Sequence, residues 1–351
     1  MRVIHTADLH LDSRLSLNLD STRAKERRKE LLLSFANLCR YARDNRVDVV
    51  IIAGDMFDKD RVSLKALDYV ATIMNEYKEI DFLYAPGNHD GSLDFKDLKP
   101  DNLHIFKSSY NTISYKECNI TGIAYNDNNK NDIYDSLVLD KNKINIVTMH
   151  GPVSDSPKDG ICISMLKDKG IDYLALGHIH SYKTGRIDSR GGYAYSGCLE
   201  GRGFDEAGPK GFILLDIDKE IKSRFIKFNY RELFNIDVDV KGFKTSLDLR
   251  EGIYKGISGI DKKNMIRINL VGEFPLTLIK NLEPLEAELN GLYYLVRIVD
   301  NTHPYINPME YEHDKSLKGE FIRMVLASDN SQEDKERIIE CGIKALIEGE
   351  L

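Results

Sequence analysis

The sequence predicts an α/β protein with one large sheet-based domain, a smaller α+β domain and a helical tail. Up to residue 230, strand-like runs of β-branched residues alternate with helical runs, which is typical of layered α/β folds. After Arg231 the apolar residues instead recur in short runs of alternating hydrophobicity. A chain of 351 residues is also too long for one compact core, since a domain usually takes roughly 100–200 residues.

The first domain is expected over residues 1–230, as a unit of two packed sheets. Arg2–Ala7 reads as a strand and Ser21–Arg46 as an amphipathic helix, because Leu31, Phe35 and Leu38 recur at helical spacing. A second helix is expected at Leu64–Tyr77. The remaining strands are predicted at Val47–Ala53, Phe82–Ala85, Ile144–Met149, Tyr173–Leu176, Gly211–Asp216 and Ile221–Phe228.

The first helix begins with a group of basic residues, Arg23, Lys25, Arg27, Arg28 and Lys29. We interpret this group as a solvated helix face, since charge runs on helices are more often exposed faces than phosphate sites.

The second domain is expected over residues 231–310 and the tail over 311–351. Strands are predicted around Ile236, Ile268 and Val296, with a helix from Leu276 to Leu289 between the last two. The tail holds two amphipathic segments, Leu317/Phe321/Val325 and Ile339/Ile343/Leu346. Ser331 with Asp334 resembles a capping box at the start of the second segment.

Composition limits the classes of function. Lys and Arg number 49 against 56 Asp and Glu, so the net charge is -7 and no global positive field recruits nucleic acid. Binding to a polyanion would therefore need local basic patches or metal ions. The five cysteines form no C-x-x-C pair, which indicates reduced thiols rather than a zinc ribbon. Without a signal-like N-terminus or a long apolar run, the expected location is the cytoplasm, with no membrane association.

Five short polar motifs stand at the carboxyl ends of predicted strands. They are Asp8-Leu9-His10, Gly54-Asp55, Gly87-Asn88-His89-Asp90, His150-Gly151 and Gly177-His178-Ile179-His180. Each motif by itself is an ordinary turn or a polar surface segment. Five of the nine histidines, however, fall in this ordered series, so coincidence is a poor explanation.

The residue types in the series predict a site for two metal ions. Residues i and i+2 of a strand share a face, so Asp8 and His10 are expected to point in one direction, as are His178 and His180. The adjacent glycines would let the backbone turn sharply. Carboxylate, imidazole and amide donors suit Mn²⁺, Fe²⁺ or Zn²⁺, and seven donors around one shared carboxylate indicate two ions.

The series D-x-H, G-D, G-N-H-D, H and G-H-x-H resembles the calcineurin-like metallophosphoesterase superfamily. The segments HTADLHLD, APGNHD, YLALGHIH and SGCLEGRGFDEAGPKG are similar to its DNA repair exonuclease branch, which includes SbcD and YhaO-like nucleases. The resemblance is strongest over residues 1–215. It implies a four-layer αββα sandwich, a small α+β capping domain with C-terminal helices, DNA as substrate, a homodimer, and an SMC-like ATPase partner of the SbcC type.

The resemblance also implies roles for individual residues. One metal ion would be held by Asp8, His10, Asp55 and His180, and the other by Asp55, Asn88, His150 and His178, with Asp55 as the bridge. His89 would be the catalytic histidine, oriented by Asp58 or Asp90. Asp58 stands where some nuclease relatives have a second histidine. The glycine-rich loop around Arg202 has two interpretations of equal weight, a contact of Arg202 with substrate phosphate or merely a tight connection between strands.

The leading hypothesis is a Mn²⁺-dependent DNA phosphodiesterase in DNA repair, chiefly a 3′→5′ exonuclease with some single-strand endonuclease activity. A small-molecule phosphodiesterase, such as a cyclic-nucleotide enzyme, or a protein phosphatase is an alternative on the same site. The sequence from Gly54 to Asp60 departs from the G-D-x-V-D-R-G pattern of protein phosphatases. A non-catalytic scaffold is a second alternative.

Overall fold

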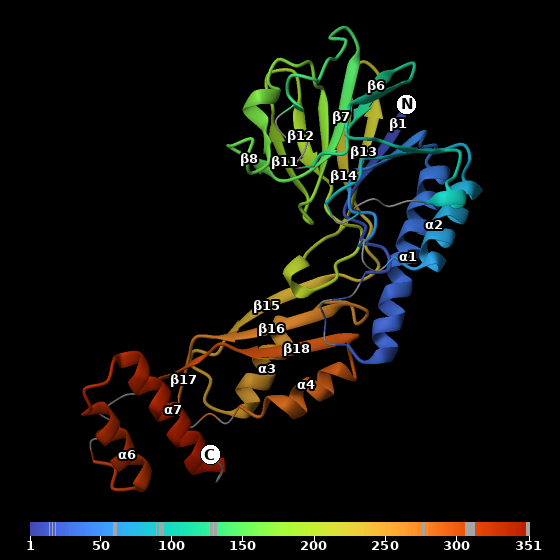
Figure 1. Cartoon of the computed structure of the whole chain (residues 1–351). Helices are drawn as coiled ribbons and strands as arrows, with labels where there is room; N and C mark the ends of the chain where they lie inside the picture. The colour runs from blue at the N-terminus through green and yellow to red at the C-terminus, as the bar shows by residue number, and fades with distance from the viewer. Residues whose placement is uncertain are drawn as a thin grey trace. The chain divides into compact units, whose positions relative to one another are not determined.

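The structure, a computed structural model, divides into two compact units, Met1–Glu232 and Leu233–Leu351. It describes residues 1–13, 15, 17, 19–58, 62–88, 90, 95–126, 129, 132–275, 278, 280–305 and 313–348. Figure 1 shows the course of the whole chain. Each unit is described by itself below.

The first unit contains two six-stranded sheets. The first sheet has the order β14 (Ile221–Lys227), β13 (Gly211–Ile217), β1 (Arg2–Thr6), β2 (Val49–Ile52), β3 (Asp81–Tyr84) and β4 (Leu103–Ile105). The second has the order β11 (Lys183–Arg186), β12 (Gly192–Tyr195), β10 (Tyr173–Gly177), β7 (Ile144–His150), β6 (Cys118–Gly122) and β5 (Asn111–Ser114). Within each sheet the central strands run parallel, so their carboxyl ends meet at one edge.

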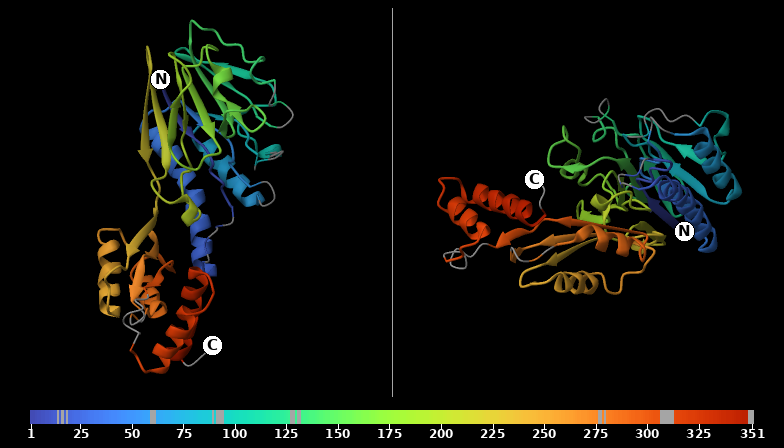
Figure 2. Two further views of the ribbon diagram at one scale, coloured as in Figure 1. Left: turned by 90° about the vertical axis from the view of Figure 1, so that its left-hand side faces the viewer. Right: turned by 90° about the horizontal axis from the view of Figure 1, so that it is seen from below.

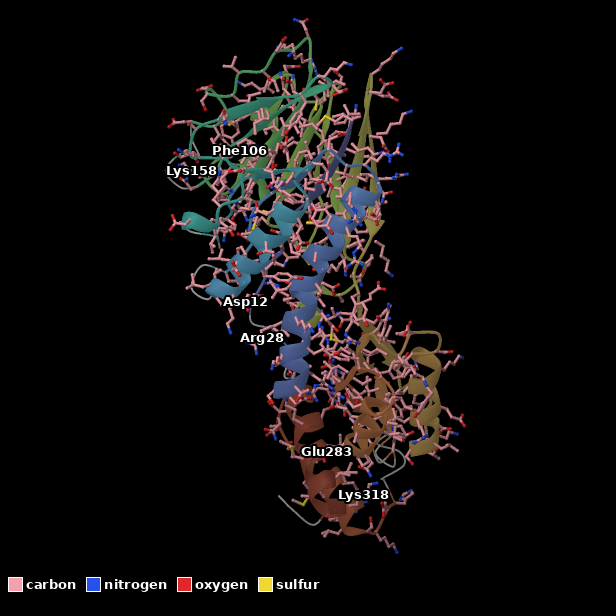
Figure 3. The ribbon with its side chains drawn as sticks, turned by 90° about the vertical axis from the view of Figure 1, so that its right-hand side faces the viewer. Asp12, Arg28, Phe106, Lys158, Glu283 and Lys318 are labelled. Carbon is pink, nitrogen blue, oxygen red and sulfur yellow. The ribbon has the colours of Figure 1, made fainter. Side chains whose placement is uncertain are left out.

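The two sheets pack face to face through a shared core. Val3, Val49 and Ile51 of the first sheet meet Ile146 and Ala175 of the second in one buried cluster. Phe106, labelled in Figure 3, belongs to the same cluster. Both faces of each central strand are therefore buried, which explains why the strands read as continuous apolar runs rather than alternating ones.

Helices cover the outer face of the first sheet. In α1 (Ser21–Asp44) and α2 (Leu64–Glu76), apolar stripes including Phe35 and Val70 pack on Ile4, Val50 and Phe82. Asp20 caps α1 by accepting hydrogen bonds from the backbone N–H groups of Thr22 and Arg23, both at 2.9 Å. The predicted strands and both predicted helices of this unit are confirmed, with boundaries shifted by a few residues.

The outer face of the second sheet has a thinner cover. There a buried cluster joins Val147 and Leu174 to Tyr134 and to the 3₁₀ segment η3 (Ile163–Leu166). Two short strands, β8 (Val153–Ser154) and β9 (Ile161–Cys162), lie in the same part of the chain. The arrangement is an α/β sandwich whose fourth layer, over the described residues, consists of turns, 3₁₀ helix and the two short strands.

The basic start of α1 is only partly the solvated face that the sequence predicts. Lys25, Arg28 and Lys29 are exposed, and Arg28 lies on the helix surface in Figure 3. Arg27, in contrast, is fully buried. The prediction was wrong for Arg27, because two of its partners, Glu200 and the carbonyl of Gly201, lie far away in the sequence and leave no local pattern.

Arg27 belongs to a buried ion-pair cluster of four residues, namely Arg27, Glu30, Glu200 and Arg231. Arg27 pairs with Glu30, reaches Glu200 at 3.3 Å and donates to the carbonyl of Gly201 at 3.0 Å. Arg231 donates to Glu30 at 2.7 Å. The cluster joins α1, the glycine-rich loop and the last residues of the first unit.

Arg27→Met should lower the stability of the first unit by about 3–5 kcal/mol, because it leaves the buried carboxylates of Glu30 and Glu200 short of a positive partner. The midpoint of urea unfolding measures this loss. Arg23→Met is the matched control on the same helix, since its pair with Asp20 is largely exposed and should contribute less than about 1 kcal/mol. Equal midpoints for the two variants would contradict a structural role for the cluster.

The second unit is built on a parallel three-stranded sheet, β15 (Leu233–Asp239), β16 (Met265–Val271) and β18 (Leu295–Asp300). Two helices connect the strands, α3 (Ser246–Gly256) and α4 (Leu282–Asn290), and pack on one face of the sheet. The three strands are confirmed. The helix predicted from Leu276 begins at Leu282, and residues 276, 277 and 279 lie outside the described residues. The sequence analysis did not predict α3.

The remaining elements of the second unit are β17 (Glu273–Pro275), β19 (His303–Tyr305) and the helices α6 (Leu317–Leu326) and α7 (Gln332–Glu348). The two helices lie side by side in Figures 1 and 2 and share a small core of Ile322, Val325, Ile339 and Ile343. Both tail helices are confirmed. The separation of residues 311–351 as their own domain stays a prediction.

Across the described residues, every helix is too short or too polar to cross a membrane.

Candidate metal centre

The five predicted motifs converge where the strand ends of the two sheets meet. β1, β2 and β3 bring Asp8, Asp55 and Asn88 from the first sheet, and β7 and β10 bring His150 and His178 from the second. The backbone N–H of Asp8 donates to the carbonyl of Gly54 at 3.1 Å. The backbone N–H of His178 donates to both carboxylate oxygens of Asp8, at 2.9 and 3.1 Å. Asp8 therefore joins the two sheets at this edge.

The geometric reason that the sequence analysis gave for the D-x-H and H-x-H pairs is wrong. β1 ends at Thr6 and β10 at Gly177, so the paired residues lie beyond their strands. Asp8, His10, Asp55 and His178 have positive φ angles of 51°, 42°, 48° and 103°. Strand alternation does not continue through such a backbone, and each residue held there costs on the order of 1 kcal/mol or more.

The glycines beside the site serve two different purposes. Gly54 has a φ of 90°, and a Cβ atom there would lie 2.0 Å from Nδ1 of His150. Gly87 and Gly177 are needed only for close approach, because their Cβ atoms would lie 2.3 Å from Oδ1 of Asp55 and 1.7 Å from the carbonyl oxygen of Ala53. The predicted role in turning the backbone thus holds at Gly54, and the other two glycines let the strand ends touch.

Gly54→Ala should displace the imidazole of His150 and reduce the number of metal ions bound per chain, since the added methyl group occupies the place of Nδ1. Gly242→Ala is the matched control, because Gly242 has a similar φ of 89° and nothing within 4 Å of a built Cβ atom. The control isolates the backbone cost of placing a side chain at a positive φ, about 1–2 kcal/mol. Elemental analysis of the purified variants gives the metal content. Full metal content in Gly54→Ala would show that His150 tolerates displacement.

Asp8, His10 and His180 form one group whose ligand atoms lie within 4.8 Å of one another. Nδ1 of His10 donates to Asp58 at 2.8 Å, and Nδ1 of His180 donates to Glu206 at 2.7 Å. Hydrogen bonds from His180 and Arg202 outweigh the effect of burial and hold the pKa of Glu206 below its ordinary value. In the neutral form of each imidazole the proton therefore lies on Nδ1, and Nε2 carries the lone pair.

The two Nε2 atoms, of His10 and His180, lie 3.3 Å apart. When both rings are neutral, two lone pairs face each other at this distance and repel unless a proton or a metal ion lies between them. The buried carboxylates of Asp8 and Asp55 are close by. This half of the site thus has the donor set and the orientation that a divalent metal ion requires.

Asp8, Asp55 and His150 form a second group within the same limit. Nδ1 of His150 bonds to the carbonyl of Ala53 at 3.0 Å, so Nε2 faces Oδ1 of Asn88 at 2.9 Å and Oδ2 of Asp55 at 3.3 Å. When His150 is neutral, its Nε2 and these two oxygens are three hydrogen-bond acceptors that converge on one point. A second cation fits there by the same argument.

The titration of His150 in this group also indicates a cation site. Burial lowers the pKa of His150, but the hydrogen bond to Asp55 and the charges of Asp8 and Asp55 outweigh burial and raise it to about 9. Burial raises the pKa of Asp8. In the absence of metal a proton on His150 compensates these carboxylates, so metal binding here competes with that proton.

His178 lies beside the second group, with its ring centroid 5.3 Å from that of His150. A pocket of about 450 Å³ opens there, and its walls include Asn88, His150, His178, Tyr125 and Lys158. The pocket leaves this half of the site open to solvent.

The four other predicted site residues have different surroundings. Asp58 contacts His10, as described above. Asp90 is buried and accepts hydrogen bonds from the backbone N–H groups of Phe57 and Gly87, at 3.0 and 2.8 Å, so it ties two of the site loops together. Arg202 donates to Glu206 at 2.9 Å. His89 lies outside the described residues.

The sequence analysis missed Glu206 and Lys210. Glu206 fixes the ring of His180, and the buried ammonium group of Lys210 donates to the carbonyl of His180 at 2.6 Å. Both residues lie in the segment SGCLEGRGFDEAGPKG, whose charged residues in a glycine-rich loop are the only local signal.

Residues 1–182 match the family model of the calcineurin-like phosphoesterases. The DNA double-strand break repair protein Mre11 of Sulfolobus acidocaldarius is 25% identical over 302 residues, which cover 79% of this chain and 76% of that protein. The protein of the same name from Saccharolobus solfataricus is 26% identical over 365 residues, with 97% and 93% covered. The uncharacterized metallophosphoesterase YhaO of Bacillus subtilis is 26% identical over 342 residues, with 87% and 82% covered.

Proposed function

The chain belongs to the calcineurin-like phosphoesterase family, and from this premise we propose that it is a Mn²⁺-dependent DNA phosphodiesterase of DNA repair. The proposed activity is chiefly 3′→5′ exonuclease, with single-strand endonuclease activity. Relatives at about 25% identity that carry the name DNA double-strand break repair protein support the choice of DNA. The observation that carries the proposal is the convergence of imidazole nitrogens and carboxylate oxygens in two groups.

We assign Asp8, His10, Asp55 and His180 to one metal ion and Asp55, Asn88, His150 and His178 to the other. Oδ2 of Asp55 lies 3.3 Å from Nε2 of His150 and 3.8 Å from Nε2 of His10, which supports its role as the shared ligand. Nitrogen and oxygen donors without sulfur suit Mn²⁺, Fe²⁺ and Zn²⁺, and of these we propose Mn²⁺.

Bound divalent ions would polarise a phosphodiester and promote attack by water. The residues of the chain supply the rest of the chemistry. Asp58 and Glu206 keep the ligand histidines in the required tautomer, and Asp90 holds the two loops that carry Asp55 and Asn88. We assign to His89 the protonation of the leaving oxygen. The pocket beside His178, with Lys158 in its wall, offers room for the nucleotide next to the scissile bond.

The proposal extends to partners and location. We expect a cytoplasmic homodimer that acts together with an SMC-like ATPase of the SbcC type. The net charge of -7 supports the need for a partner, because an acidic chain by itself holds DNA weakly.

The proposal is tested by incubating the purified full chain with Mn²⁺ and four substrates in parallel. These are linear duplex DNA labelled at the 5′ end, the same duplex labelled at the 3′ end, circular single-stranded DNA, and a cyclic nucleotide. A 3′→5′ exonuclease releases labelled mononucleotides first from the 3′-labelled duplex, and cleavage of the circle reports endonuclease activity. Hydrolysis of the cyclic nucleotide without cleavage of DNA would refute a nuclease and favour the small-molecule enzyme. Two bound metal ions without any hydrolysis would favour the scaffold.

A further inference from the structure

Two carboxylates from separate loops each bind the Nδ1 atom of one histidine in the group formed by Asp8, His10 and His180. Asp58, after β2, accepts from His10, and Glu206, in the 3₁₀ segment η4 (Phe204–Glu206), accepts from His180. The rings of His10 and His180 are 5.1 Å apart at an angle of 67°. The mutual orientation of the two Nε2 atoms therefore depends on the distance between Asp58 and Glu206.

Arg202 connects these two carboxylates. Its Nε and Nη2 atoms donate to Oε1 of Glu206 at 3.2 and 2.9 Å, and its backbone N–H donates to Oε2 at 2.7 Å. Its Nη1 atom lies 3.9 Å from Oδ2 of Asp58. The guanidinium group thus lies between Asp58 and Glu206, and the Arg202 side chain is 17% exposed.

The buried ion-pair cluster also fixes the residues that precede Arg202. The neighbouring carbonyl of Gly201 accepts from Arg27 at 3.0 Å, and Glu200 accepts from the backbone of Tyr230 at 2.5 Å. A flexible arginine on the surface samples many rotamers before it binds a phosphate. The chain just before Arg202, in contrast, is anchored at Gly201 and Glu200, and the guanidinium group of Arg202 is engaged by Glu206.

We propose that Arg202 is a positioning residue that links Asp58 to Glu206 and so sets the spacing of the His10 and His180 ligands of one metal ion. This inference rests on the proposed function, because it takes His10 and His180 as ligands. The proposed partners of the guanidinium group are these two carboxylates and not a substrate phosphate. A planar fork suits this task, since it binds carboxylates in fixed directions, which a lysine ammonium does not do.

The experiment is a calorimetric Mn²⁺ titration of the full chain in wild type, Arg202→Met, Arg202→Lys and Glu206→Gln. Loss of a residue that orients a metal ligand typically weakens metal affinity 10–100-fold. We expect a loss of roughly that size at one of the two sites in all three variants, with the other site unchanged. The double variant Arg202→Met/Glu206→Gln should lose less than the sum of the single variants, because the two residues act through one contact.

Arg250→Met is the matched control. Arg250 makes a comparable pair with Glu288, at 2.5 and 2.6 Å, in the second unit. Its removal should leave both Mn²⁺ affinities unchanged. Thermal melts of all variants show whether the fold is retained, and the d–d absorption of bound Co²⁺ should change in Arg202→Met and remain unchanged in Arg250→Met.

A phosphate contact gives the opposite pattern and would overturn the proposal. In that case both Mn²⁺ affinities stay normal in Arg202→Met, binding to DNA in EDTA weakens with a salt slope smaller by about 0.9, and Arg202→Lys restores most of the binding. An equal loss at both metal sites together with a lower melting temperature would also overturn it, as a general structural effect. If wild-type protein binds two Mn²⁺ ions but cuts no DNA, the nuclease proposal fails while the titration still decides the role of Arg202.

Discussion

Asp55→Asn should abolish metal-dependent cleavage of DNA while the fold is retained. Asparagine has nearly the same shape as aspartate, but it removes a carboxylate charge whose Oδ2 atom lies 3.8 Å from Nε2 of His10 and 3.3 Å from Nε2 of His150. The two cations would then lose the anionic ligand that they share, and their mutual repulsion would be less compensated. We expect less than two metal ions per chain by elemental analysis and no release of mononucleotides from duplex DNA.

Asp216→Asn is the matched control for this variant. Asp216 pairs with Arg2 at 2.9 Å on the surface of the first sheet, where its side chain is 39% exposed. Normal metal content and normal cleavage are expected there. An Asp55→Asn protein that binds two ions and cuts DNA at the wild-type rate would show that Asp55 is not the bridge.

His89→Leu should slow DNA cleavage by about 10²–10⁴-fold without loss of metal, because a general acid acts on the substrate and is not a ligand. Single-turnover cleavage rates and the metal content of the same preparation measure the two effects. His104→Leu is the control, since His104 is an exposed residue of β4 beside Asp81. A parallel loss of metal in His89→Leu would place His89 among the ligands and end its assignment as the acid.

The candidate ligands could be predicted from the sequence because each signal is local. A buried run of apolar residues ends, a glycine permits close approach, and the polar residue follows within a few positions, as at Gly54-Asp55 and Gly87-Asn88. Parallel strands then bring such ends to one edge, whatever the separation of the strands in the sequence. The order of the motifs was therefore sufficient to predict which residues come together at this edge of the sheets.

The partners of those ligands could not be predicted in the same way. Asp58 meets His10 from 48 positions away, and Glu206 meets His180 from 26 positions away. No periodicity relates such pairs, and an aspartate beside a G-D motif has several candidate neighbours. The same applies to Arg27, which pairs with Glu200 at a separation of 173 positions. The sequence therefore predicted Arg27 to be an exposed basic residue of α1 like its neighbours.

Helix α3 was missed for a different reason. Only Leu249 and Ile253 of this helix are buried, so its apolar stripe is too sparse to recognise by spacing. Its start carries a capping box, in which Thr245 accepts from the backbone of Asp248 and Asp248 accepts from the backbone of Thr245. A search for capping pairs, as applied at Ser331 and Asp334, would have found it.

The left-handed backbone at Asp8, His10, Asp55 and His178 has a consequence for protein engineering. Together the four residues store on the order of 4 kcal/mol or more, a sizeable share of the 5–15 kcal/mol that usually separates folded from unfolded protein. The surrounding sandwich must supply this energy through contacts that the motifs do not contain. The metal centre therefore cannot be transplanted as a set of short peptides. A new scaffold would have to reproduce the touching strand ends, with glycine at positions equivalent to 54, 87 and 177, before the same side chains would bind metal.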